Sequence, residues 1–187
     1  MMAAMRILLL LLLLLPAGPL RAEHEEAALR DRGVGVMRHG GAIAAPAGTP
    51  PPVPGCHPGA VLTDAGRAEM RRWGAMLRDR GIGPVTIHTS RQCSAWETAL
   101  LLGLGPVEPD TELDPPPPAE MTQRGERLRQ RLVALSGARE AGGPAALFIT
   151  HRALIAAMTG IEAAHGEVLV LGSDHGALSL LGRLSVE

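Results

Sequence analysis

The most hydrophobic stretch of the chain lies at its N-terminus, where an unbroken apolar run, residues 7–15, follows Arg6. A proline and a glycine interrupt the run, and the sequence Leu-Arg-Ala ending at Ala22 offers a small-residue cleavage site. This layout is typical of a secretory signal peptide, and the run is shorter than the roughly 20 residues that a membrane span needs. We therefore expect a signal peptide at residues 1–22 and one domain at residues 23–187, with no stable membrane span after cleavage. An uncleaved N-terminal anchor is the alternative.

Short apolar runs that end at polar residues recur farther along the chain. Three of them predict buried strands, at residues 34–37, 84–88 and 145–150. Two more runs, residues 168–171 and 178–186, predict a further pair of strands, antiparallel at one edge of the sheet.

Between these runs, apolar residues recur at helical spacing. The clearest segment runs from Thr63, a candidate N-cap, to Gly81, a natural C-terminal stop. Further helices are expected at residues 95–102, 120–137 and 152–158.

Two segments are too rich in proline to form packed elements and are expected to be loops. They are residues 42–58, which contain TPPPVPG, and residues 113–120, which contain four consecutive prolines. The helix expected at 95–102 has three candidate caps: Thr89, Ser90 and Ser94.

Strands that alternate with helices predict a three-layer α/β/α sandwich around a mainly parallel central sheet. In such sheets, ligands bind beyond the carboxyl ends of the strands. The first expected strand ends at Arg38-His39-Gly40, the second ends near Arg91, and the third ends at His151. Parallel neighbouring strands would bring these histidines and arginines to one edge of the sheet.

These residue types suit phosphoryl chemistry. Arg38 carries a permanent positive charge on a planar fork of donors that matches phosphate. His39 can be neutral near neutral pH and can then act as a nucleophile. Gly40 lets the backbone approach a ligand closely or take a positive φ. For the tripeptide alone, a basic surface turn is the alternative.

The charge balance adds little to this picture. The chain contains no lysine, so arginine is its only permanently basic residue and any single arginine is less informative. Removal of residues 1–22 leaves 16 of the 18 arginines against 19 acidic residues. A mildly acidic domain gives no support to a nucleic-acid partner, and none is expected.

The chain has two cysteines, Cys56 and Cys93. Their spacing fits no zinc motif, and the sequence shows no other cluster of metal ligands. In an exported protein a disulfide is the favoured interpretation, with two free buried thiols as the alternative.

Taken together, these segments resemble the histidine phosphatase superfamily, which includes phosphoglycerate mutases, acid phosphatases and bacterial phosphohistidine phosphatases. VMRHGG is similar to its Arg-His-Gly signature, and LTDAGRAEMRRWGAMLRDRGI to the helix that opens with Leu-Ser/Thr-x-x-Gly-Arg. The family's second strand and helix are similar to IHTSRQCSAWETALLLG. The strand that carries its second catalytic histidine is similar to LFITHRALIAAMTGI, and the strand after that is similar to HGEVLVLG. The similarity spans about residues 33–187 and is greatest to a small exported bacterial branch.

The resemblance implies a phosphoglycerate mutase-like fold and a phosphohydrolase that cleaves a phosphomonoester or a phosphoramidate. His39 would attack phosphorus and become a phosphohistidine, with its other ring nitrogen fixed by a backbone carbonyl. Arg38 and His151 would hold the phosphoryl oxygens, with Gly40 beside them. Neither a metal nor a cofactor is implied. The partner is a phosphorylated substrate, and the sequence leaves its identity and the oligomeric state open.

The chain departs from the family pattern at Ser94, where the family usually has an arginine, and at Ala60, where exported relatives tend to have one. Arg91 is the candidate replacement as a phosphate-binding residue. Asp114 and Glu120 flank the four prolines and are the candidate general acids, with solvated loop carboxylates as the alternative. A pocket that has lost positive charge favours an alternative function. The protein would then be a catalytically weak or inactive relative that binds a phosphorylated or anionic ligand.

The resemblance also places Cys56 and Cys93 near each other, beside the site. A disulfide between them would join the first proline-rich loop to the start of the second helix, in a periplasmic or extracellular protein. The remaining histidines after residue 40 are expected to be surface or structural residues, apart from His151: His57, His88, His165 and His175.

Overall fold

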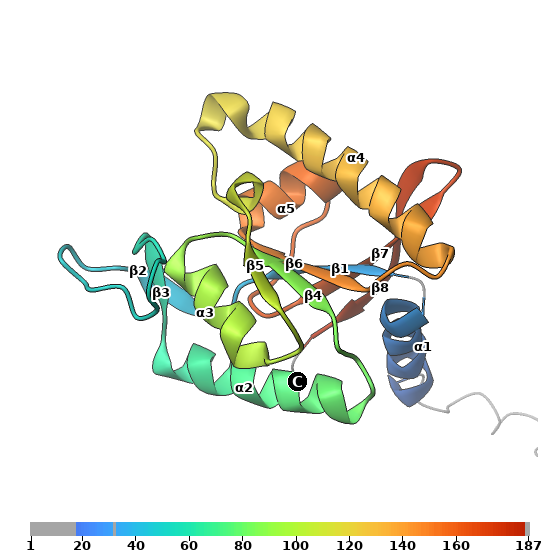
Figure 1. Ribbon diagram of the computed structural model, residues 1–187, viewed down its shortest axis with the longest axis horizontal. Coiled ribbons are helices and arrows are strands. Elements are labelled where there is room, and N and C mark those ends of the chain that lie inside the picture. The colour runs from blue at the N-terminus through green and yellow to red at the C-terminus, as the bar shows by residue number, and fades with distance from the viewer. Residues whose placement is uncertain (1–17, 32, 186–187) are drawn as a thin grey trace, which may run out of the picture.

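The computed structural model describes residues 18–31 and 33–185. Figure 1 shows a central sheet between two layers of helices. The helices are α1 (Gly18–Asp31), α2 (Asp64–Asp79), α3 (Cys93–Leu102), α4 (Met121–Glu140) and α5 (Arg152–Thr159). The strands are β1 (Val34–Arg38), β2 (Ala42–Ala44), β3 (Ala60–Leu62), β4 (Thr86–Thr89), β5 (Val107–Pro109), β6 (Ala146–Thr150), β7 (Val168–Asp174) and β8 (Ala177–Leu184).

The main sheet has six strands in the order β5-β4-β6-β1-β7-β8. The first four are parallel, whereas β7 runs antiparallel to β1 and β8 antiparallel to β7. The three-layer sandwich with a mainly parallel sheet is therefore confirmed. So is the C-terminal antiparallel pair, in which β8 is the edge strand.

Side chains alternate across the sheet and divide the core into two layers. Val36 and Phe148 face the side covered by α4 and α5, where they pack with Leu132. Met37 and Ile149, their neighbours along the chain, face the other side and pack with residues of α1, α2 and α3 (Figure 1). Both faces of β1 and β6 are thus covered, which explains their unbroken apolar sequences.

The start of α2 lies directly against the loop that follows β1. As expected, Thr63 caps this helix, and its side chain accepts a hydrogen bond from Gly66 N at 3.0 Å. A Cβ on Gly66 would lie 2.2 Å from the Gly41 carbonyl oxygen, so only glycine allows this approach. The helix thereby supports the segment that carries the candidate nucleophile.

The expectation that residues 42–58 form only a loop was wrong. The segment begins with β2, which pairs with β3 in a small antiparallel sheet, with Ala42 opposite Leu62. The loop expected at 113–120 contains a short 3₁₀ turn, Pro118–Glu120, and follows another, Thr111–Leu113. Three-residue elements carry too little periodicity to be predicted from sequence.

The N-cap of α3 also differs from the expectation. It is Gln92, which makes no side-chain capping bond, rather than Thr89, Ser90 or Ser94. Ser90 Oγ instead accepts a hydrogen bond from Gln92 N at 3.2 Å and contacts Asp114 and His151. Its hydroxyl therefore belongs to the site.

Helix α1 was not predicted, and it starts before the expected cleavage position at Ala22. Ala28 and Leu29 are buried in the core, and Glu26 pairs with Arg80 at the end of α2. These contacts join the part of the helix after Ala22 to the domain. Most of the expected signal peptide, residues 1–17, lies outside the described residues. Within the described part of the chain, no helix is long and apolar enough to cross a membrane.

Cys56 and Cys93 form a disulfide, with their α-carbons 4.9 Å apart. This confirms the expected pairing. Next to it, His57 N donates to Arg91 O at 2.8 Å and Cys93 N donates to His57 O at 3.0 Å. The bridge and these two bonds attach the β2–β3 connection to the segment between β4 and α3.

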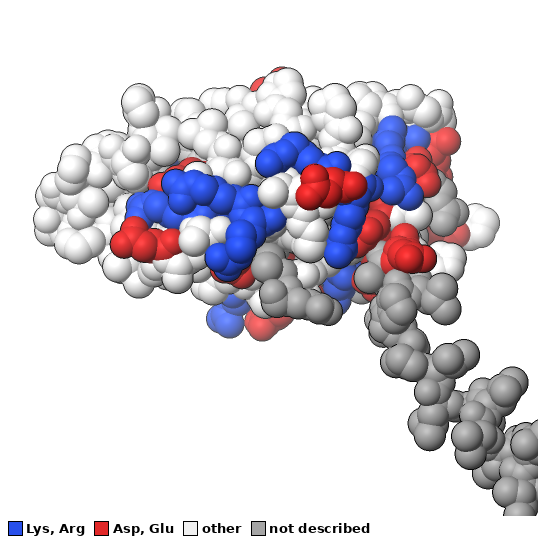
Figure 2. Space-filling model, turned by 90° about the horizontal axis from the view of Figure 1, so that it is seen from below, with Lys and Arg blue, Asp and Glu red and all other residues white. Residues whose placement is uncertain are grey.

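Charged side chains of both signs cover the face on which α2 lies. Figure 2 shows arginines there next to aspartates and glutamates. Arg71 and Arg72 on α2 are exposed, as expected for a solvated helix face, and Arg67 pairs with Asp64 and Glu97. Mixed charges of this kind keep a helix surface solvated without forming a field of one sign.

Candidate active site

The two candidate catalytic histidines meet at the carboxyl ends of adjacent parallel strands. Arg38 at the end of β1 is in register with Thr150 at the end of β6, so the next residues, His39 and His151, lie side by side. Their ring centroids are 5.1 Å apart, in an edge-to-face arrangement. The parallel pairing of β1 with β6 therefore brings together the two histidines that the sequence placed at one edge of the sheet.

The His39 ring is oriented by the backbone. Its Nδ1 lies 2.8 Å from the carbonyl oxygen of Gly40. A carbonyl only accepts, so Nδ1 carries the proton and Nε2 carries the lone pair. The ring is buried, and burial lowers the pKa of His39 to about 4, with smaller contributions from His165 and Arg38. His39 is therefore neutral at pH 7, as a nucleophile must be.

Gly40 has a packing role in this arrangement. A Cβ at this position would lie 2.8 Å from Met70 Cγ. Its N–H donates to Thr98 Oγ1 at 3.0 Å, so that donor is already committed within the protein. Gly40, which was expected to lie at the phosphate, therefore has no free N–H to offer to it in this structure.

Arg38 is held by two neutral acceptors. Its Nη1 donates to Ala163 O at 3.2 Å, and its Nη2 lies 2.8 Å from His165 Nε2. Its buried Nε has no hydrogen-bond partner among the described residues. Burial, followed by the charge of Arg152, lowers the pKa of Arg38, but a guanidinium remains protonated in proteins. A donor without a partner and a full positive charge are thus present at the strand end.

His165 belongs to the site, although it was expected to be a surface or structural residue. It is exposed, and its ring centroid lies 5.2 Å from that of His39. No pattern in the sequence pointed to it, because His165 lies in the connection between α5 and β7 rather than directly at the end of a strand. The other three histidines of that group lie elsewhere: His57 lines a nearby cavity, His88 stacks on Phe148, and His175 is an exposed turn residue.

The His151 ring contacts Ser90, and Ser90 contacts Asp114. His151 Nε2 lies 3.0 Å from Ser90 Oγ, which lies 3.0 Å from Asp114 Oδ1. An ionised carboxylate only accepts, so the hydroxyl donates to Asp114 and accepts from His151 Nε2–H. The pKa of His151 is lowered to about 3, chiefly by burial, with a smaller lowering from the neighbouring His39 that is opposed by Asp114. Both histidines are therefore neutral at pH 7.

Arg91 and Asp114, two of the candidate site residues, are paired with each other. Asp114 accepts hydrogen bonds from Arg91 N and Nε, each at 2.7 Å, and Arg91 Nη2 lies 2.6 Å from Oδ2. Together with Ser90, Arg91 places donors at both oxygens of the carboxylate. Asp114 is thus arranged as an acceptor rather than as a general acid, and it cancels much of the charge that Arg91 was expected to offer to phosphate.

Glu120, the other candidate general acid, is exposed and pairs with Arg124 Nη2 at 3.6 Å. It does not line the cavity beside Asp114. Ser94 is fully buried at the start of α3, and its Oγ has no partner among the described residues. The position that carries arginine in the family is therefore enclosed, and Ala60 lies in β3. We assign no general acid from this structure.

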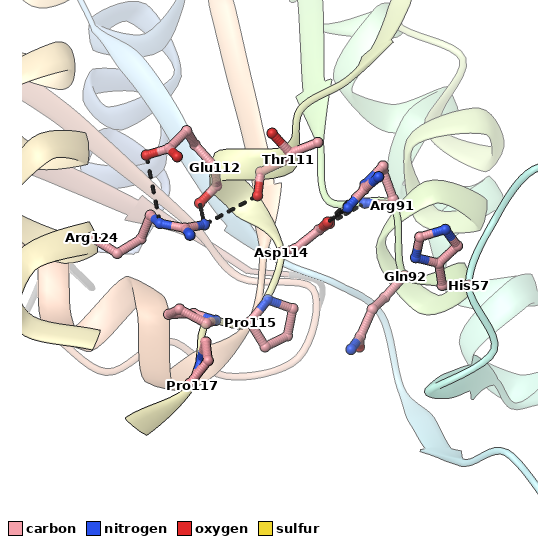
Figure 3. A pocket seen from close by; sticks show the side chains of 10 residues that line it. His57, Arg91, Gln92, Thr111, Glu112, Asp114, Pro115, Pro117 and Arg124 are labelled. Carbon is pink, nitrogen blue, oxygen red and sulfur yellow. Dashed lines mark hydrogen bonds and ion pairs between the residues drawn. The ribbon is translucent and has the colours of Figure 1, made fainter. Parts of the chain in front are cut away.

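A cavity of about 420 Å³ is lined by Arg91 and Asp114, and neither His39 nor His151 lines it. Arg91 and Asp114 form part of its wall and connect it to His151 through Ser90. Figure 3 shows His57 and Arg91 on one side of the cavity, and the prolines and Arg124 on the other. Its lining is mainly polar: His57, Arg91, Gln92, Thr111, Glu112, Asp114, Pro115, Pro116, Pro117 and Arg124.

The described residues contain no group of three or more histidine, cysteine, aspartate or glutamate side chains that could hold a metal ion.

By sequence, the chain matches no family model and no curated protein. Solved structures do match it. The protein histidine phosphatase SixA complexed with tungstate has a TM-score of 0.59 at 18% identity and covers 82% of this chain and 96% of its own. Phosphoserine phosphatase from Entamoeba histolytica, in complex with 3-phosphoglyceric acid, has a TM-score of 0.56 at 12% identity, covering 83% and 98% of the two chains.

At these identities the comparison establishes the fold. The chain has the phosphoglycerate mutase-like α/β fold of the matched phosphatases and spans nearly their whole length. The fold that the resemblance to histidine phosphatases implied is thus confirmed.

Proposed function

We propose that the protein is a phosphohydrolase that cleaves a phosphomonoester or a phosphoramidate through a phosphohistidine at His39. The observation that carries the proposal is the His39 ring itself. Its Nδ1–H is bonded to Gly40 O at 2.8 Å, its Nε2 lone pair is free to attack, and a burial-lowered pKa of about 4 keeps it neutral. A second neutral histidine and the Arg38 guanidinium lie beside it.

In the first step, His39 Nε2 forms a bond to phosphorus as the bond to the leaving group breaks. The leaving group takes the bonding electron pair and accepts a proton. The positive charge of the Arg38 guanidinium, which lies beside the histidine pair, is suited to stabilise the phosphoryl oxygens, where negative charge is concentrated. In the second step, water attacks phosphorus, the P–N bond breaks, and inorganic phosphate leaves. The water proton passes to the surroundings, and His39 recovers its lone pair.

The cavity lined by Asp114, which contacts His151 through Ser90, is suited to the leaving group. Its wall offers the donors of Arg124 and Gln92 and the carboxylates of Glu112 and Asp114, with proline rings between them (Figure 3). A lining of this kind favours ligands that can form hydrogen bonds with it. We therefore infer a polar, hydrogen-bonding leaving group rather than a lipid chain.

Export is part of the same proposal. Residues 1–22 would be a signal peptide that directs the protein to the periplasm or the cell exterior. The disulfide between Cys56 and Cys93 supports this location, because such bonds persist in oxidising compartments.

A second candidate function is binding of a phosphorylated or anionic ligand without turnover. Two observations favour it. Ser94 stands buried where the family usually has an arginine, and Asp114 cancels much of the charge of Arg91. Loss of one charge-stabilising donor costs roughly 10²–10³ in rate, so an enzyme with this site could be slow.

The two functions are separated by a panel of phosphorylated compounds, including phosphoserine, a sugar phosphate and a phosphohistidine peptide. We expect release of inorganic phosphate by the exported, disulfide-bonded protein and no release by its His39→Ala variant. The matched control, His175→Asn, changes an exposed turn histidine and should keep the wild-type rate. Saturable binding of these compounds without phosphate release would support the second function and reject the first.

A further inference from the structure

Residues 163–167, the last part of the connection between α5 and β7, are hydrogen-bonded to the end of β1. Gly166 N donates to Arg38 O at 3.1 Å, and Arg38 N donates to Glu167 O at 3.2 Å. Trp73 Nε1 from α2 donates to Gly166 O at 2.9 Å. These bonds fix the backbone on the C-terminal side of His165 and determine where its ring lies.

The His165 ring makes one contact with Arg38 and one contact with His39. Its Nε2 lies 2.8 Å from Arg38 Nη2, and its Nδ1 lies 3.1 Å from the carbonyl oxygen of His39. A guanidinium only donates and a carbonyl only accepts. One tautomer of the neutral ring satisfies both contacts, with the proton on Nδ1 and the lone pair on Nε2.

This contact differs from the one made by the other arginine near the site. Asp114 holds Arg91 with a carboxylate and so cancels much of its charge. His165 and the carbonyl of Ala163 hold Arg38 with neutral acceptors, which orient the guanidinium and leave its charge intact. Ser94 supplies no charge where the family has an arginine, and Arg91 is paired with Asp114, so Arg38 is the guanidinium beside the histidine pair that has no direct carboxylate contact among the described residues.

We propose that His165 is a positioning residue of the phosphoryl site, which holds Arg38 through its neutral Nε2 and His39 through Nδ1–H. The inference rests on the proposed phosphatase function, but its contacts can be tested by oxyanion binding as well. His165 acts through Arg38 and the His39 carbonyl, and no step of the reaction is assigned to its own atoms.

Four substitutions separate the two contacts and the charge. In His165→Gln, the amide oxygen can take the place of Nε2 and keep the bond to Arg38. In His165→Asn, the amide nitrogen can take the place of Nδ1 and keep only the bond to His39 O. His165→Leu removes both bonds, and His165→Glu keeps an acceptor for Arg38 but adds a negative charge.

We expect kcat/KM to stay within about threefold of the wild-type value in His165→Gln and to fall about tenfold or more in His165→Leu, the usual effect of losing a hydrogen bond to a charged group. His165→Glu should fall at least as far, because its carboxylate cancels the charge of Arg38. His165→Asn should lie near His165→Leu if the Arg38 contact dominates. Equal values for the Gln and Glu variants would reduce His165 to a structural support and overturn the proposal.

Tungstate affinity, measured by calorimetry, makes the test independent of turnover. If His39→Ala is inactive while His165→Leu keeps wild-type kcat/KM and tungstate affinity, the inference fails and the proposed function stands. If no phosphorylated compound is hydrolysed but tungstate affinity falls in the Leu and Glu variants and not in the Gln variant, the inference stands and the proposed hydrolysis fails. A wild-type protein that neither hydrolyses the panel nor binds tungstate would overturn both.

A measurement on the unsubstituted protein covers the case in which a variant does not fold. Long-range ¹H–¹⁵N correlation of the imidazole rings at neutral pH distinguishes the two neutral tautomers from the cation. We expect the Nδ1–H tautomer for His165, as for His39. An Nε2–H tautomer or a protonated ring at His165 would contradict the proposal.

Discussion

Arg91 and Asp114 are joined at three points. The carboxylate accepts from Arg91 N and Nε, each at 2.7 Å, and Arg91 Nη2 lies 2.6 Å from Oδ2. The same carboxylate accepts from Ser90 Oγ, the group that contacts His151. Asp114 therefore has two effects: it offsets the positive charge of Arg91 at the rim of the site, and through Ser90 it orients His151. A change at Asp114 should thus alter both the charge of the site and the orientation of this histidine.

The first prediction follows from that pair. Asp114→Asn keeps an oxygen that can accept from Ser90 and Arg91 but removes the negative charge. The uncovered guanidinium should then attract oxyanions, and tungstate affinity at low salt should rise by about threefold to tenfold, with a smaller gain at high salt. Calorimetry at the two salt concentrations measures both effects.

The matched control is Glu126→Gln, which removes an equal charge from the exposed surface of α4. It should leave tungstate affinity unchanged. If Asp114→Asn behaves like this control, Arg91 has no access to the bound oxyanion and must be removed from the candidate site.

The second prediction concerns stability in acid. His39 and His151 have folded-state pKa values of about 4 and about 3, against 6.5 for an ordinary histidine, chiefly because they are buried. Below pH 6.5 the unfolded chain therefore binds more protons at these positions than the folded protein does, so the free energy of unfolding falls as pH falls. Each histidine should cost on the order of 3 kcal/mol across this range.

Urea unfolding at a series of pH values between neutral and pH 4 measures this loss. The His39→Gln variant has one such histidine fewer, so its stability should depend less steeply on pH. His175→Asn, at an exposed position, should follow the wild-type curve. Parallel wild-type and His39→Gln curves would show that His39 is not held neutral by the fold.

The third prediction concerns the disulfide. It closes a loop with a sequence separation of 37 residues, and the chain-entropy model gives such a bridge at most roughly 4 kcal/mol of stability. It also holds His57 and Gln92, which line the cavity beside the site. Reduction should therefore raise KM more than it lowers kcat, because the loosened wall must be ordered when substrate binds.

A double variant, Cys56→Ser with Cys93→Ser, should show the same kinetics with or without reductant. Mass spectrometry of the non-reduced, exported protein should find the bridge closed. Two freely alkylatable thiols in the folded protein would contradict the prediction that the disulfide holds the cavity wall in place.

The sequence predicted those parts of the site that depend on regular, local patterns. Residues 34–37 and 145–150 are unbroken apolar runs because both faces of their strands are covered by helices. Parallel strands of this kind end at one edge of the sheet, so the runs predicted that His39 and His151 lie at the same edge. Their direct contact depends on the pairing of β1 with β6, which the structure shows. The cap at Thr63 and the pairing of the two cysteines were likewise predicted.

The remaining features depend on contacts between residues far apart in the chain. Arg38 and His165 are separated by 127 positions, and nothing in the turn around His165 indicates that it faces β1. Arg91 and Asp114 are 23 positions apart and meet only because a short 3₁₀ turn brings the second beside the first. The pairing of these two candidates could therefore not be inferred from residue types.

The central claim is that His39 is the nucleophile, and trapping of the intermediate tests it most directly. Wild-type protein is mixed with a radiolabelled phosphoester from the panel, quenched in alkali during the first turnover, and digested for mass spectrometry. The account predicts acid-labile, base-stable phosphate on the peptide that contains His39, and none in the His39→Ala variant. Label on a serine, or full turnover by His39→Ala, would contradict it.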